Sequence, residues 1–134
     1  LAGMVEAAGL AGRVRLLGRR ADAPRLMAAL DVHVLASSFG EGFPNVVGEA
    51  MSCGVPCVVT EVGEAALVVG DAGAAVPPRN PRALAMALRS ILSMRPSERE
   101  ELSRKARQRV LDRYGLPAVA RRYEDIYASL RAGD

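Results

Sequence analysis

The sequence predicts an α/β domain in which helices flank a parallel β-sheet. Short apolar segments rich in β-branched residues alternate with amphipathic segments, and strands separated by helices run parallel because their crossovers are right-handed. The chain has 134 residues, of which 50% are hydrophobic, so it is long enough for one domain with its own core. It contains no apolar run of the roughly 18 residues that would span a membrane.

The expected helices and strands follow one another along the chain. Helices are expected at residues 1–10, 24–30, 46–53, 64–69, 81–92, 97–114 and 116–130, and strands at residues 14–17, 32–35, 56–60 and 74–76. The strand segments are short and mostly apolar, which is typical of strands buried on both faces. Apolar residues recur at helical spacing in the last three helical segments, so these helices are expected to be amphipathic.

The most informative stretch is the glycine-rich loop between the strand at residues 32–35 and the helix at residues 46–53. Gly40 and Gly42 allow backbone amides to come close to a ligand, and Asn45 is expected to be the N-cap of the helix. Anions and sugars bind where the carboxyl end of a parallel strand faces the amino end of a helix, because amides and helix dipole both point outward there. The loop is therefore the expected ligand site.

Two carboxylates, Glu41 and Glu49, lie eight positions apart across this loop and helix. Gly54 is expected to end the helix, and Pro56 cannot extend it. The two carboxylates suit the binding of sugar hydroxyl groups, or the acid and base of a glycosidase, and the spacing alone leaves both open. An exposed pair on a solvated face is the alternative without a function, but it leaves the loop between them unexplained.

The pattern Glu41-Gly-Phe-Pro-Asn-x3-Glu49-Ala-Met-x2-Gly54-x-Pro56 resembles the Glu-x7-Glu signature of family four, the retaining nucleotide-sugar glycosyltransferases with the GT-B fold. Four further segments resemble that family, at residues 14–18, 29–32, 69–73 and 76–78. The resemblance implies a Rossmann-like parallel sheet with flanking helices. It also implies that residues 1–134 are the C-terminal part of a GT-B donor-binding domain, with a helical tail at residues 81–131.

The resemblance also implies roles for the loop residues. Glu41 is the expected catalytic residue, which contacts the donor sugar or favours positive charge at the anomeric carbon. Glu49 is expected to accept hydrogen bonds from the ribose hydroxyls. Gly18 and Arg19 match the turn that contacts the base in the family, although an arginine there is as often only solvated. The expected donor-binding residues are Gly42, Phe43, Pro44, Asn45, Val46, Glu49, Gly18 and Arg19.

The partners follow from the same resemblance. The donor is expected to be a nucleotide-diphospho-sugar, transferred with retention and without a cofactor or metal, and the acceptor is a sugar, a lipid or another molecule. The first GT-B domain, which this sequence lacks, is a further expected partner. Cys53 and Cys57 accompany a single His, too few ligands for structural zinc, so both are expected to be reduced thiols in a cytoplasmic protein.

Charge is unevenly distributed. Residues 1–78 carry five Lys and Arg against eight Asp and Glu, whereas residues 79–134 carry thirteen against seven. The basic half has the charge to contact nucleic acid or anionic lipid. Its acids are interspersed and no aromatic residues alternate with its arginines, which favours a solvated helix surface. We therefore expect no nucleic-acid partner, and at most a peripheral position at the inner face of the membrane.

Three residues near the loop have weaker signals. Ser37 and Ser38 are expected either to order the loop or to cap the strand. His33 alternates with valines, so we expect a satisfied histidine on a sheet face rather than a catalytic one. Because the loop leads from a strand into a helix, the carboxylates of Glu41 and Glu49 are expected to border one cleft.

Two departures from the family favour an alternative function, a truncated or degenerate module that binds a nucleotide or a partner without catalysis. The first is at residues 60–67, where the family usually has a second glycine and an acidic residue in place of Leu67. The second is that the family's first two strands would precede Leu1, which separates residues 14–17 from residues 32–35 by two places in the sheet. We expect an oligomer through the free edge at residues 32–35 or direct pairing of these two segments, and a catalytically silent isolated chain.

Overall fold

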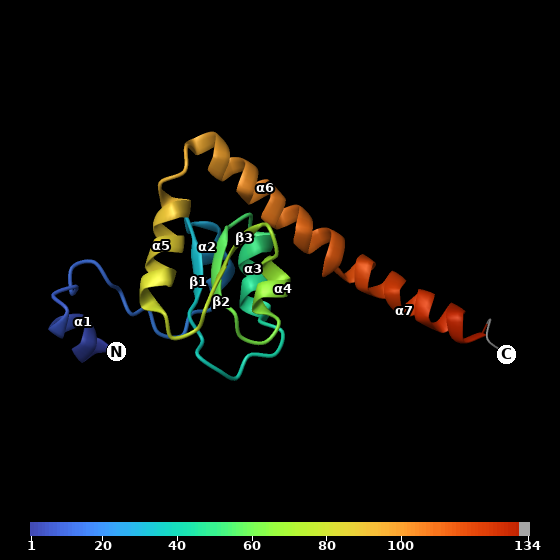
Figure 1. Cartoon of the computed structure of the whole chain (residues 1–134), viewed down its shortest axis with the longest axis horizontal. Coiled ribbons are helices and arrows are strands. Elements are labelled where there is room, and N and C mark those ends of the chain that lie inside the picture. Colours follow the sequence, from blue (N-terminus) through green and yellow to red (C-terminus); the bar gives the residue numbers. More distant parts are fainter. Residues whose placement is uncertain (132–134) are drawn as a thin grey trace.

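A three-stranded parallel sheet in the order β1–β2–β3 lies at the centre of the structure (Figure 1). This computed structural model describes residues 1–131. The strands are β1 (His33–Leu35), β2 (Cys57–Thr60) and β3 (Gly73–Val76), and their register places His33 opposite Cys57 and Cys57 opposite Gly73. The predicted α/β class with a parallel sheet and flanking helices is confirmed.

Helices cover both faces of the sheet. The helices are α1 (Ala2–Ala7), α2 (Ala23–Ala28), α3 (Asn45–Ser52), α4 (Ala65–Val69), α5 (Pro81–Leu92), α6 (Pro96–Arg113) and α7 (Leu116–Arg131). Helix α5 packs on one face, α3 and α4 pack on the other, and α6 crosses over α3 (Figure 1). The predicted helices and the three later predicted strands agree with these bounds to within three residues at each end.

The core lies between the sheet and the layer formed by α3, α4 and α6. All four residues of β2 are buried, and Cys57 and Val59 pack there with Met51 and Val68. Alternation along the strand turns Val58 toward the α5 face. Burying a side chain of this size stabilises the fold by about 1.5–3 kcal/mol, so β2 and α3 are firmly held, and the loop before α3 is built on them.

The sequence predicts correctly where α3 ends but not which residue caps its start. Gly54 has φ of +76°, and its amide donates to the Met51 carbonyl while that of Val55 donates to the Ala50 carbonyl, which is a Schellman ending. The prediction for Gly54 is confirmed. The prediction that Asn45 is the N-cap is wrong, because Pro44 holds that position and its carbonyl accepts the first hydrogen bond, from Val47 at 3.0 Å.

The prediction of a strand at residues 14–17 is wrong. This segment is irregular and exposed, with Leu16 at 55% and Leu17 at 53% of full exposure. A strand is stable only beside another strand that takes up its backbone hydrogen bonds, and no described strand lies next to this segment. The predicted pairing of residues 14–17 with residues 32–35 is therefore wrong as well, and within residues 1–131 one edge of β1 has no neighbouring strand. The oligomer through this edge stays a prediction.

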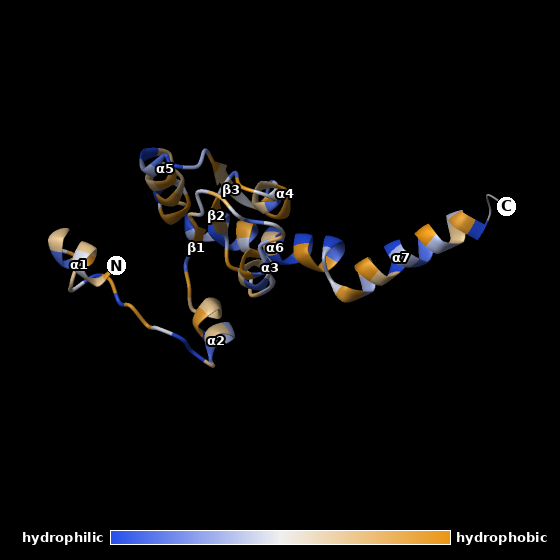
Figure 2. Cartoon of the chain, turned by 90° about the horizontal axis from the view of Figure 1, so that it is seen from below, coloured by the Kyte–Doolittle hydropathy of each residue, from blue (hydrophilic) through white to orange (hydrophobic). Residues whose placement is uncertain are grey.

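Helix α7 extends away from the sheet beyond the end of α6 (Figure 1). Its exposed apolar residues alternate with polar ones along the helix (Figure 2), and they are Leu116, Tyr123, Ile126, Tyr127 and Leu130. The break between the two helices falls at Gly115, where a Cβ would lie 2.7 Å from the Leu111 carbonyl oxygen. None of the helices in residues 1–131 is both long and apolar enough to cross a membrane.

Candidate functional site

The loop from β1 to α3 is held by hydrogen bonds to the last residue of β2 and to the segment that follows it. The Thr60 hydroxyl donates to the Ser37 carbonyl at 2.6 Å, and the Glu64 amide donates to the Gly42 carbonyl at 3.1 Å. Within the loop the Ser37 hydroxyl donates to Oε1 of Glu41 at 2.5 Å. The prediction that Ser37 orders the loop is confirmed, and the carboxylate of Glu41 has a defined place.

Gly63 permits this contact between the two segments. Its φ is +55°, and a Cβ there would overlap the Glu41 carbonyl and lie 2.8 Å from the Gly42 carbonyl oxygen. No other residue type fits without moving the loop. Sequence reasoning missed Thr60 and Gly63 as supports of Glu41. The signal that points to them is a glycine three residues after the buried Thr60, which ends β2.

The amino end of α3 presents backbone amides at this loop. Gly42, Phe43 and Asn45 are exposed, whereas Pro44 is buried and anchors the turn. The amides of Asn45 and Val46 precede the first hydrogen bond within the helix, so they are free to donate to an external acceptor. In an eight-residue helix these amides and the helix dipole favour an anion.

Glu49 lies exposed on α3 and borders a pocket of about 280 Å³. The pocket lies between α3 and the end of α6, and its other lining residues are Phe43, Asn45, Gly48, Ser52, Val110 and Tyr114. It brings together three of the predicted donor-binding residues. Glu41 is half-buried and does not line it, so the shared cleft for the two carboxylates stays a prediction.

Gly18 and Arg19 lie in the irregular segment before α2, and both are exposed. Gly18 borders a different pocket, of about 320 Å³, which is lined by residues of that segment, of α2 and of β1, among them Leu17, Met27 and His33. Neither Gly18 nor Arg19 lines the pocket at Glu49, and their contact with the base stays a prediction.

His33 points into this second pocket, and its Nε2 atom is buried without a hydrogen-bond partner among residues 1–131. The prediction of a satisfied histidine is wrong for this atom, and most of the side chains that line the pocket with it, such as Leu17 and Met27, are apolar. Burial lowers the pKa of His33 from its ordinary value.

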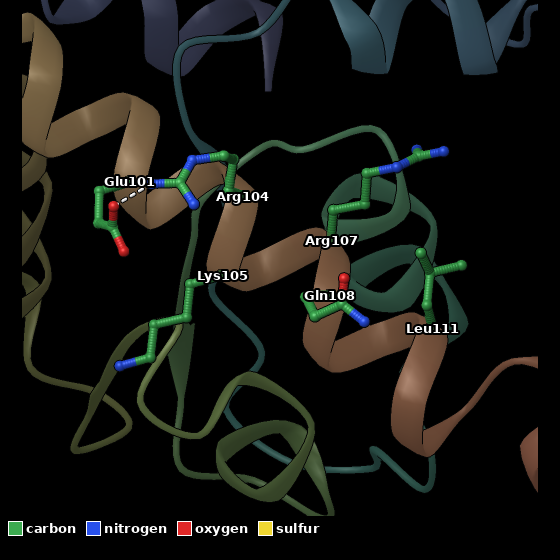
Figure 3. A pocket seen from close by; sticks show the side chains of 6 residues that line it. All are labelled: Glu101, Arg104, Lys105, Arg107, Gln108 and Leu111. Atoms are coloured by element: carbon green, nitrogen blue, oxygen red, sulfur yellow. Dashed lines mark hydrogen bonds and ion pairs between the residues drawn. The ribbon is translucent and has the colours of Figure 1, made fainter.

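Another pocket, of about 600 Å³, is lined by residues of α6 alone (Figure 3). Its cations already have partners within the molecule. Arg104 pairs with Glu101, Arg107 donates to the Ser52 carbonyl, and Lys105 pairs with Asp71 at 2.8 Å. Two of these cations are paired with carboxylates and the third is held by a backbone carbonyl, so size alone does not make this pocket the functional site.

The thiols of the chain are free. Cys57 is buried beneath α3, and Cys53 is half-buried at the end of that helix. Burial raises the pKa of Cys57 to about 12, so its thiol stays protonated and unreactive at neutral pH.

The chain is similar to known glycosyltransferases over most of its length. A family model described as "Glycosyl transferases group 1" matches residues 2–94. An N-acetyl-alpha-D-glucosaminyl L-malate synthase from Bacillus anthracis is 31% identical over 124 residues, which are 91% of this chain and 32% of the relative. A glycogen synthase from Mycobacterium tuberculosis is 32% identical over 111 residues, or 81% of this chain and 26% of the relative.

Solved structures give the same result. Sucrose-phosphate synthase from Thermosynechococcus elongatus superposes with a TM-score of 0.82 and 32% identity, over 99% of this chain and 34% of that one. HepE from Anabaena, solved in complex with UDP, superposes with a TM-score of 0.84 and 27% identity, over 96% of this chain and 35% of that one.

The chain thus spans about a third of the length of the first curated relative and about a quarter of the second. The matched residues 2–94 include the whole sheet, the signature loop and α3. Because the family model matches more than half of the residues of this chain, the chain belongs to the family of glycosyl transferases group 1.

Proposed function

We propose that the chain is the donor-binding part of a retaining glycosyltransferase of family four that uses a nucleotide-diphospho-sugar. The observation that carries the proposal is the loop at residues 41–46, in which exposed residues at the amino end of α3 follow directly after a carboxylate held in place. That combination suits a donor with a diphosphate and a sugar, because the amides meet the anion and the carboxylate meets the hydroxyl groups.

The diphosphate would bind at the amides of Asn45 and Val46, and Gly42 and Phe43 would flank it. A hydrogen bond to a charged group contributes about 1.5–3 kcal/mol. Glu49, exposed one helical turn further along α3, would accept the ribose hydroxyls. The relative HepE, solved with UDP and glucose, supports a uridine nucleotide as the first donor to test.

Glu41 would contact the donor sugar or stabilise positive charge at the anomeric carbon as the bond to the diphosphate breaks. The proposal assigns no protein nucleophile, metal or cofactor. The leaving group keeps its charge against the helix amides, which lowers its need for a general acid. Front-face departure and attack would then retain the anomeric configuration.

The alternative function is a non-catalytic module. One reason for it is the altered segment at residues 60–67, but Thr60, Gly63 and Glu64 of this segment hold the loop that carries Glu41. A segment that supports the site favours an enzyme. The glycosidase alternative is weaker as well, because helix amides suit a phosphate-bearing donor better than a neutral glycoside.

The rest of the proposal concerns the whole protein. Residues 1–134 would be the later part of a GT-B donor-binding domain, and the tail at residues 81–131 would extend it. The earlier part of this same domain would supply further cations for the diphosphate, and a second Rossmann-like domain would supply the acceptor side. The isolated chain would therefore bind donor weakly and transfer nothing. Free thiols at Cys53 and Cys57 support a cytoplasmic location.

Titration of the isotope-labelled chain with UDP and UDP-glucose, followed by amide NMR shifts, tests the site. The first amides to shift should be those of Gly42, Phe43, Asn45 and Val46, and UDP-glucose should also shift Glu41. Shifts confined to the pocket along α6, or none at millimolar nucleotide, would contradict the proposal.

A further inference from the structure

We infer that Ser37 and Thr60 are positioning residues that hold the Glu41 carboxylate where a donor sugar would meet it. The inference rests on the proposed role of Glu41 and extends it to two hydroxyl groups outside the signature. The two hydroxyls form a relay from β2 to Glu41, in which Thr60 fixes the backbone of Ser37 and Ser37 fixes the side chain of Glu41.

Thr60 begins the relay at the carboxyl end of β2. It is only 4% exposed, so its hydroxyl needs partners within the protein. The hydroxyl donates to the Ser37 carbonyl at 2.6 Å and lies 3.4 Å from the Leu35 carbonyl oxygen. Both carbonyls belong to the chain that leaves β1, so Thr60 sets the direction in which this chain enters the loop.

Ser37 completes the relay by donating to Oε1 of Glu41 at 2.5 Å. A hydroxyl that donates to an ionised carboxylate makes a short, strong bond, and this bond holds a side chain that otherwise rotates about several bonds. It uses one of the two carboxylate oxygens, which leaves Oε2 for a sugar hydroxyl.

The backbone of Glu41 is fixed from the same side. The absence of a side chain at Gly63 lets the Glu41 carbonyl pack against that residue, and the amide of Glu64 holds the Gly42 carbonyl at 3.1 Å. With backbone and side chain both restrained by residues 60–64, Glu41 is preorganised rather than free to swing into solvent. Preorganised groups bind more tightly because less freedom is lost on binding.

The experiment compares UDP and UDP-glucose binding to the full chain and its variants by NMR titration. Ser37→Ala and Thr60→Val should weaken UDP-glucose by about 3- to 10-fold, the loss of about one hydrogen bond, and leave UDP within about 2-fold. Ser37→Thr and Thr60→Ser keep the hydroxyls and should restore binding. Ser93→Ala, which removes a hydroxyl bonded within its own helix end, is the matched control and should change neither ligand.

Glu41→Gln separates the proposed role of Glu41 from its positioning by Ser37 and Thr60. If this variant binds both ligands as the original chain does, the proposed role of Glu41 fails and the inference fails with it. If it loses UDP-glucose selectively while Ser37→Ala and Thr60→Val do not, the role of Glu41 stands and the inference is overturned. Equal losses of UDP and UDP-glucose in Ser37→Ala would also overturn it, since they would reflect a general effect on the fold.

A second measurement needs no ligand. Three-bond couplings of the Glu41 side chain should report one rotamer in the original chain and in Ser37→Thr, and rotamer averaging in Ser37→Ala. If neither nucleotide binds, these couplings still decide the positioning. One rotamer in all three chains would overturn it.

Discussion

The ring of Phe43 packs edge-on against the ring of Tyr114, with their centroids 5.2 Å apart and their planes inclined by 62°. Phe43 belongs to the signature loop and Tyr114 directly follows α6. The Tyr114 hydroxyl also donates to the Leu67 carbonyl at 3.3 Å, at the end of α4. One side chain thus ties the loop and α4 to the junction between α6 and α7.

Removal of this aromatic pair should destabilise the fold in a coupled way. A double-mutant cycle of Phe43→Ala and Tyr114→Ala should give a coupling free energy of about 0.5–1.5 kcal/mol, the value typical of edge-to-face pairs. Urea unfolding measures it. Tyr114→Phe keeps the ring and should cost no more than about 1 kcal/mol for the lost hydroxyl bond. Strict additivity of the two alanine variants would show that the rings do not interact in solution.

Arg109 is expected to be the most important cation for stability. Its side chain is 13% exposed, and it donates to the Val68 carbonyl at 2.9 Å and the Leu67 carbonyl at 2.7 Å, at the carboxyl end of α4. Arg109→Met keeps the stem but leaves these carbonyls without their charged donor, so unfolding free energy should fall by about 2–3 kcal/mol. The control Arg113→Met, at an exposed position on the same helix, should stay within about 0.5 kcal/mol.

Arg79 is a site where a substitution should stabilise the protein. It has φ of +57°, a left-handed conformation that costs a residue with a Cβ roughly 1–2 kcal/mol. Arg79→Gly relieves that strain and loses part of the gain to the greater freedom of glycine in the unfolded chain, so we expect a net gain of about 0.5–1 kcal/mol. Thermal unfolding checks it. Arg82→Gly, within α5, should instead lose about 1 kcal/mol, and a loss at both positions would contradict the argument.

Glu49 should matter for nucleotide binding and little for folding. It is exposed on α3 and borders the pocket with Phe43 and Asn45. Glu49→Gln keeps the shape of the side chain and removes the charge that would strengthen the proposed bonds to ribose hydroxyls. In a full-length enzyme it should weaken nucleoside diphosphate binding by about 1–2 kcal/mol, as measured by calorimetry, with unchanged unfolding. Glu100→Gln, exposed on α6, is the control. Unchanged affinity in Glu49→Gln would remove this residue from the site.

Much of the fold could be predicted because its signals are local. Apolar runs and helix-ending glycines such as Gly54 act over a few residues, so most element bounds follow from them. Residues 14–17 show the limit, because a strand also needs a neighbour, and that requirement is not written in the segment itself. Asn45 shows a second limit, because Pro44 and Asn45 are neighbours and either could be the N-cap. The hydrogen bond from the Val47 amide to the Pro44 carbonyl identifies Pro44.

The candidate site, like the fold, could be predicted only where its signals are local. Glu41, Glu49 and the loop between them could be found from one continuous stretch of sequence. The supports of Glu41 could not, because Thr60 lies 23 residues after Ser37 and its role depends on β1 and β2 being neighbours. The buried Nε2 of His33 was missed for a similar reason, since alternation along β1 indicates which face a side chain takes but not which partners it finds there.

His33 should make the stability of the fold depend on pH near neutrality. Burial lowers the pKa of His33 in the folded state below the ordinary value of about 6.5 expected when the chain is unfolded. Between these two values the unfolded chain binds more protons, so folding free energy is lost as pH falls through that window and levels off below the folded-state pKa. His33 is the one histidine of the sequence, and the lowered pKa values of Asp22, Asp71 and Glu98 place their own titrations at more acidic pH.

Urea unfolding at pH 7.5 and at steps down to pH 5.5 (roughly one unit to either side of the ordinary histidine pKa) should show this loss of stability. His33→Val, which keeps a β-branched side chain in the strand and removes both the titration and the unpaired nitrogen, should abolish it. The same slope in both chains would mean that His33 finds a partner or solvent in the folded state.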